Sequence, residues 1–155
     1  MAGETTAEER LAALGLVLPA PAAPGGNYLP ARQAGSLLFL AGVISSNDSG
    51  VLSGTVGLDR SVEEGREAAR CCALTQLSVI RRQLGTLDRV EQVITVNGYV
   101  NAVSGFPDSP KVINGASDLL VEVFGDAGRH ARAAIGVAAL PRHALVELQM
   151  VVAVR

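Results

Sequence analysis

The apolar residues of this chain fall into short runs and helical spacings that are separated by clear turn signals. Residues 36–44 (SLLFLAGVI) form an apolar run between Gly35 and the polar stretch SSNDSG, which is typical of a buried strand. Turn-forming residues follow at 47–50, so we expect 51–56 to return as the second strand of a hairpin.

Three segments have the spacing of amphipathic helices. Ser61 and Glu64 form a capping-box pattern, and the apolar positions after them stay on one face until Gly85. We therefore predict a long helix between them. A further helix is predicted over about 111–124, and a short one over 6–16.

The rest of the chain is predicted to form strands. Residues 90–103 are rich in β-branched side chains and suit a central strand. Strands over 131–139 and 145–154 are separated by Leu-Pro-Arg-His at 140–143. The order hairpin, helix, strand, helix, strand, strand predicts an α+β fold with two helices on one face of the sheet.

The length and composition indicate one globular domain. We interpret residues 1–155 as a single domain in which 1–27 form an N-terminal helix and a Pro/Gly-rich arm. Hydrophobic residues make up 48% of the chain but aromatic ones only 3%, so we expect a core of Val, Leu, Ile and Ala. The apolar excess favours a homo-oligomer, although buried sheet faces could also account for it.

Charge and cysteine content argue against several kinds of partner. Lys and Arg number 13 against 15 Asp and Glu, and no basic run can follow a phosphate backbone, so no nucleic-acid partner is expected. Cys71 and Cys72 are adjacent, with no His or further Cys at ligand spacing, which argues against a metal site. No segment has membrane-spanning character, and the acidic N-terminus lacks the apolar run of a secretory signal. We expect a cytoplasmic protein without a membrane partner.

The residues that point most directly to chemistry are Arg132 and Glu147. Alternation along the predicted strand places Arg132 on a face whose other residues are Gly and Ala. Their small size leaves space beside the guanidinium for a ligand carboxylate. If strands 131–139 and 145–154 pair through the turn near residue 140, Arg132 and Glu147 lie nearly opposite one another; the sequence also allows a parallel or separated placement of the two strands. The alternatives are a structural ion pair or exposed edge charges of little energetic value.

The stretch HARAAIGVAALPRHALVEL contains, in this order, an arginine, a strand of small residues, a Leu-Pro turn and a Val-Glu pair. Their order and spacing closely resemble the C-terminal signature of the Rid family, the RidA or YjgF proteins that deaminate reactive enamines and imines. The likeness extends from about Tyr28 to the end of the chain, through NYLPARQAGSLLFLAGVIS, VNGYV and VINGASDLL. It implies a mixed six-stranded, chorismate-mutase-like sheet with two helices on one face, and a homotrimer whose pockets lie between subunits.

Carried over by position, the resemblance implies roles for individual residues. Arg132 would hold the substrate carboxylate, and Glu147 would position the attacking water. The residues that would line the pocket are Tyr28, Gly42, Asn114 and Ala134. His130 precedes Arg132 by two residues and is a candidate to support it, whereas Gln149 is expected to be uninvolved.

These residue types suit a hydrolytic deaminase of 2-imino and enamine acids, which releases ammonia and a 2-keto acid. A 2-imino acid has a carboxylate for Arg132 and an imine carbon that needs one oriented water, so positioning and a carboxylate base can suffice. No metal or organic cofactor is required. A nearby Arg132 is expected to favour the ionised form of Glu147.

Two positions depart from the family pattern. Ala134 stands where imine-deaminating members often have Cys, and Val43 replaces a glutamine that often follows the strand glycine. The departures motivate an alternative function, a non-catalytic trimer that binds a small carboxylate. Ribonuclease activity, which has also been attached to this family, is not expected from the acidic charge balance.

Overall fold

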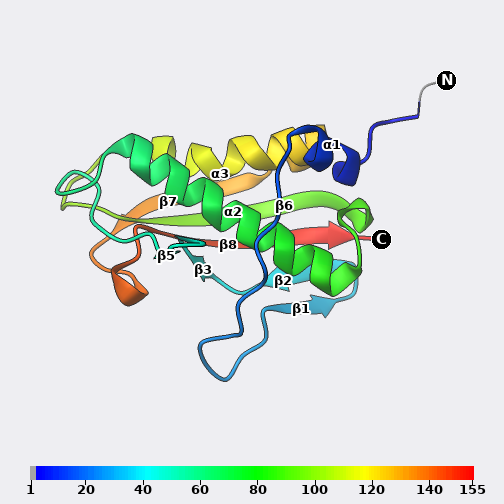
Figure 1. The fold of residues 1–155 in the computed structure, drawn as a ribbon, viewed down its shortest axis with the longest axis horizontal. Helices are drawn as coiled ribbons and strands as arrows, with labels where there is room; N and C mark the ends of the chain where they lie inside the picture. The colour runs from blue at the N-terminus through cyan, green and yellow to red at the C-terminus, as the bar shows by residue number, and fades with distance from the viewer. Residues whose placement is uncertain (1–2) are drawn as a thin grey trace.

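The central element of the fold is the long strand β6 (Val90–Asn101), the segment in which β-branched residues predict a central strand. In this computed structural model, which describes residues 3–155, β6 pairs in parallel with β7 and antiparallel with β8 (Figure 1). The sheet has six strands in the order β1-β2-β8-β6-β7, with β3 also paired to β8. The other strands of this sheet are β1 (Ala31–Ala34), β2 (Leu37–Leu40), β3 (Val43–Ile44), β7 (Ala131–Val137) and β8 (Val146–Val154).

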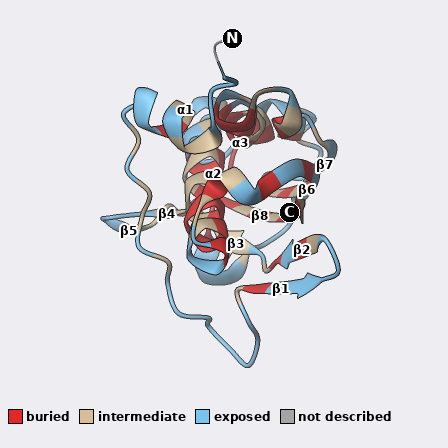
Figure 2. Ribbon diagram, turned by 90° about the vertical axis from the view of Figure 1, so that its right-hand side faces the viewer, coloured by how far each residue is buried: buried red, intermediate tan, exposed pale blue. Residues whose placement is uncertain are grey.

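Two long helices cover one face of this sheet, as predicted (Figures 1 and 2). The helix α2 (Val62–Leu84) begins at the Ser61 capping box and ends at Gly85, whose φ of 85° suits a residue without a side chain. The helix α3 (Ser109–Phe124) lies against α2, and a short helix, α1 (Ala7–Ala13), packs on α3. No helix within residues 3–155 is long and apolar enough to cross a bilayer.

The opposite face of the sheet is open, and alternation along the strands decides which side chains reach it. In β8 the residues Val146, Leu148 and Met150 are fully buried beneath the helices. Glu147 and Gln149, which alternate with them, lie on the open face and are half-buried. Polar residues of the C-terminal strand are thus turned away from the core.

The hairpin predicted between 36–44 and 51–56 is only partly correct. A turn is present after residue 47, but it joins the two-residue strands β4 (Ser46–Asn47) and β5 (Gly50–Val51), which form a separate ribbon. The main partners of β2 are β8 and β1, and β1 was not predicted from the sequence. Long-range pairing with β8 therefore took precedence over the local hairpin.

The predicted strand 36–44 is interrupted at Ala41 and Gly42. The register against β8 shifts by one residue there, because Phe39 pairs with Val151 but Val43 pairs with Leu148. The fully buried Gln76 of α2 fills the interruption, since its Nε2 donates to Ala41 O and to Leu148 O, both at 3.0 Å. One buried amide thus replaces ladder hydrogen bonds that the irregularity removes.

We expect Gln76→Leu to lower the free energy of unfolding by about 2–4 kcal/mol, because two carbonyls in the core would lose their donor. Chemical denaturation of the variant would measure this loss. The matched control is Gln83→Leu, the same substitution at an exposed position of the same helix. A loss no larger for Gln76→Leu than for Gln83→Leu would contradict the role assigned to the buried amide.

Candidate active site

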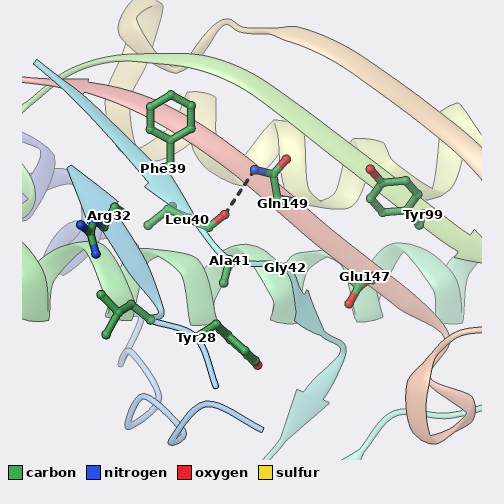
Figure 3. Close-up of a pocket in the computed structure, with 10 residues that line it drawn as sticks. Tyr28, Arg32, Phe39, Leu40, Ala41, Gly42, Tyr99, Glu147 and Gln149 are labelled. Carbon is green, nitrogen blue, oxygen red and sulfur yellow. Dashed lines mark hydrogen bonds between the residues drawn. The ribbon is translucent and has the colours of Figure 1, made fainter. Parts of the chain in front are cut away.

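A hollow of about 660 Å³ opens on the helix-free face of the sheet, between the β1–β2 hairpin and β8 (Figure 3). Three of the six residues predicted from sequence line it: Tyr28, Gly42 and Glu147. Arg32, Tyr99 and Gln149 also contribute to its wall. The hollow therefore combines a carboxylate, a guanidinium, two phenols and an amide.

The strand interruption makes room for Glu147. A Cβ added to Gly42 would lie 3.3 Å from Cδ and Oε1 of Glu147, closer than side chains normally approach. No group among residues 3–155 hydrogen-bonds to this carboxylate, and its partial burial raises the pKa of Glu147 above the ordinary value of 4.5. Glu147 is thus a proton acceptor with unused hydrogen-bonding capacity.

The other three predicted residues form a separate group at the edge of the sheet. Arg132 of β7 donates from Nη1 to Asn114 Oδ1 at 2.7 Å and to Ser117 Oγ at 3.1 Å, both on α3. Its Nη2 donates to Pro110 O at 3.4 Å. Ala134 follows Arg132 on the same face of β7 and adds no polar group. Nε–H and one Nη2 proton have no partner among residues 3–155, so they are available to a carboxylate.

The predicted pairing that would bring Arg132 opposite Glu147 is wrong. The strand β6 lies between β7 and β8, so Arg132 pairs with Val96 and Glu147 pairs with Tyr99. The Arg132 side chain reaches α3 on the helix-covered face, whereas Glu147 lies on the open face. Within one chain, Arg132 therefore does not stabilise the Glu147 carboxylate, and the pKa of Glu147 is raised by burial, not lowered as expected.

Several residues of the hollow were not predicted from the sequence. Gln149, expected to be uninvolved, donates to Leu40 O at 3.2 Å and accepts from Asn97 Nδ2 at 3.1 Å. Its period-two spacing from Glu147 was the available signal. Arg32 comes from the unpredicted strand β1, and Tyr99 reaches Glu147 through the β6–β8 register, so neither had a local signal.

This arrangement can bind an anion and accept a proton, but in one chain the two capacities lie apart. Arg132 can hold a carboxylate through its free N–H groups, and Glu147 can take a proton from water. No group of three or more His, Cys, Asp or Glu side chains suited to a metal occurs within residues 3–155. Reaction chemistry that uses both charges needs them brought together.

Comparisons with known proteins agree with the fold and with the motif. Residues 8–153 match the family described as "YjgF/chorismate_mutase-like, putative endoribonuclease". Protein TCP17 of Trypanosoma cruzi is 45% identical over 141 residues, covering 90% of this chain and 88% of TCP17. A crystal structure from Shewanella oneidensis MR-1, described as a "putative endoribonuclease", is 35% identical with a TM-score of 0.92, covering 96% of this chain and 99% of that one.

A second crystal structure, of the protein Atu1372 from Agrobacterium tumefaciens, described as having unknown function, is 38% identical with a TM-score of 0.87. It covers 96% of this chain and 92% of Atu1372. Both solved structures share the mixed sheet and its helical layer, and the family match spans nearly the whole chain. The chain therefore belongs to the YjgF/chorismate mutase-like family, the Rid proteins that its C-terminal motif resembles.

Proposed function

We propose that this protein is a hydrolytic deaminase of reactive 2-imino and enamine acids, which releases ammonia and a 2-keto acid. The observation that carries the proposal is the pair of complementary half-sites on opposite faces of the sheet. One presents the Arg132 guanidinium with free N–H groups, and the other presents the half-buried Glu147 carboxylate. Each half-site lacks what the other supplies.

A homotrimer would join the half-sites, with Arg132 of one copy facing Glu147 of the next. A head-to-tail ring of three copies makes three identical sites of this kind. The open face supports such an assembly, because large apolar side chains are exposed on it. Phe39 on β2 is 43% exposed, Ile135 on β7 is 50% exposed and Leu29 beside the hollow is 57% exposed. A neighbouring copy that covered them would remove this apolar surface from water.

In the proposed reaction, Arg132 binds the substrate carboxylate and holds the imine carbon beside Glu147. Glu147 accepts a proton from water as the water oxygen bonds to that carbon. The imine reacts in its protonated form, so attack leaves a neutral amine on that carbon. Glu147 passes its proton to this amine, the C–N bond breaks and ammonia leaves, and the hydroxyl proton goes to solvent as the 2-keto acid forms. Tyr28 and Gly42 would form the wall on the Glu147 side, and Asn114 and Ala134 the wall on the Arg132 side.

Ammonia release from freshly generated 2-iminobutanoate tests the proposal. We expect the protein to accelerate hydrolysis above the rate in solution. Arg132→Ala and Glu147→Gln should each lower kcat/KM by about 100-fold or more, because they remove the carboxylate anchor and the proton acceptor. Arg129→Ala is the matched control, since Arg129 is exposed and, among residues 3–155, forms its ion pair with Asp126 alone, at 3.1 Å. A wild-type rate equal to that in solution would rule out the deaminase.

Mixing the two inactive variants tests whether the site forms between copies. If Arg132→Ala and Glu147→Gln subunits are unfolded and refolded together in equal amounts, about one quarter of the sites in a cyclic trimer receive both native residues. We therefore expect about one quarter of the wild-type activity to return, measured by the same assay. A mixture as inactive as its components would show that the two residues do not act across an interface.

The pH dependence of kcat should report Glu147. The acceptor must be ionised, so kcat falls as the pH falls through the pKa of Glu147, which burial raises. Arg132 of the partner subunit opposes this shift, but a bound substrate carboxylate neutralises that guanidinium. We expect an acidic limb in kcat with an apparent pKa above 4.5, after correction for hydrolysis in solution. A kcat that stays constant down to pH 4.5 would contradict this role.

The alternative is a non-catalytic trimer that binds a small carboxylate in the same cleft. Ala134 and Val43 favour it, because neither side chain can hydrogen-bond to a water or an imine. Calorimetric binding of 2-oxobutanoate that depends on Arg132, without any acceleration of imine hydrolysis, would select this function over the deaminase.

A further inference from the structure

The Arg132 guanidinium is connected to a histidine through one serine hydroxyl. Ser117 lies three residues after Asn114 on α3, so both side chains face β7 and both accept from Arg132 Nη1. His130 lies just before β7, with Nε2 3.0 Å from Ser117 Oγ and Nδ1 2.6 Å from Gly128 O. The imidazole is half-buried in this position.

The chemistry of these partners determines where each proton lies. A carbonyl only accepts, so the proton of the neutral ring is on Nδ1 and donates to Gly128 O. Nε2 is then an acceptor and takes the Ser117 hydroxyl proton, which turns the Ser117 lone pairs toward Arg132. Burial lowers the pKa of His130, and the positive charge of Arg132 lowers it further, so the ring stays neutral at neutral pH.

We propose that His130 and Ser117 are positioning residues that hold the Arg132 guanidinium for a ligand carboxylate. Together with Asn114, Ser117 occupies both Nη1 protons, which fixes the plane of the guanidinium and leaves Nε–H and one Nη2 proton for a ligand. Without His130, the Ser117 hydroxyl can rotate and donate elsewhere, so Arg132 loses an oriented acceptor. The inference rests on the proposed function, in which Arg132 binds the substrate carboxylate.

Calorimetric dissociation constants for 2-oxobutanoate test the inference in a double-mutant cycle. We expect His130→Ala and Ser117→Ala each to weaken binding about three- to tenfold, the effect of one hydrogen bond. Because His130 acts through Ser117, adding His130→Ala to Ser117→Ala should change the constant less than about twofold. In the deaminase assay KM should rise by the same factor while kcat stays within about twofold. The proposal would be overturned if the two substitutions weakened binding by factors that multiply in the double variant. A fall in kcat instead of a rise in KM would also overturn it.

Nitrogen-15 NMR of the full-length protein tests the same connection without a ligand. The chain has two histidines, so the variant His143→Asn identifies the signals of His130 and also serves as the control. Asn is chosen because residue 143 has a φ of 56°, which Asn tolerates. We expect the Nδ1–H tautomer at His130, and faster rotation of the Arg132 guanidinium in His130→Ala and Ser117→Ala than in the wild type or His143→Asn. An Nε2–H tautomer or unchanged rotation would overturn the proposal.

The binding cycle and the NMR experiment together distinguish a failure of this inference from a failure of the proposed function. If the wild type neither binds 2-oxobutanoate nor deaminates, the proposed function fails, and the NMR result still decides whether His130 and Ser117 hold Arg132. If the protein deaminates but His130→Ala and Ser117→Ala weaken binding independently, the proposed enzyme activity holds and the positioning role is wrong.

Discussion

The parallel connection β6–α3–β7 is the constraint on which the rest of the structure depends. Parallel neighbours need a crossover, and here the crossover is the helix α3 on one face of the sheet. The strand β7 occupies one side of β6, and β8 pairs with the other side, antiparallel. The short connection between β7 and β8 therefore passes over the end of β6 and does not form a hairpin.

This topology divides the charged residues between two environments. Arg132, the second residue of β7, reaches the side of α3 that faces β7, where Asn114 and Ser117 accept from it. Glu147, the second residue of β8, lies on the opposite face beside the strand irregularity at Gly42, a residue without a side chain. The proposed interface between copies would account for both half-sites at once, and it would also cover the apolar surface around the hollow.

The two half-sites are built by different physical means. Hydrogen bonds orient Arg132, because a guanidinium has several donors and three acceptors surround it. Space and partial burial define Glu147, because no group among residues 3–155 donates to its carboxylate and burial raises its pKa. A rigid cation and a basic, accessible carboxylate suit the separate tasks of binding an anion and activating water.

The sequence by itself determined the local elements and the family motif, and it singled out Arg132 and Glu147 as candidate site residues. Capping boxes, Gly85 and period-two alternation act through near neighbours, so α2, the course of β6 and the faces of β8 could be predicted. The strand β1, the place of Arg32 and Tyr99 in the hollow, and the separation of Arg132 from Glu147 were decided only by tertiary structure. Strand order depends on pairing between segments far apart in the chain. The residues next to a strand in the sequence do not determine which other strand will lie beside it.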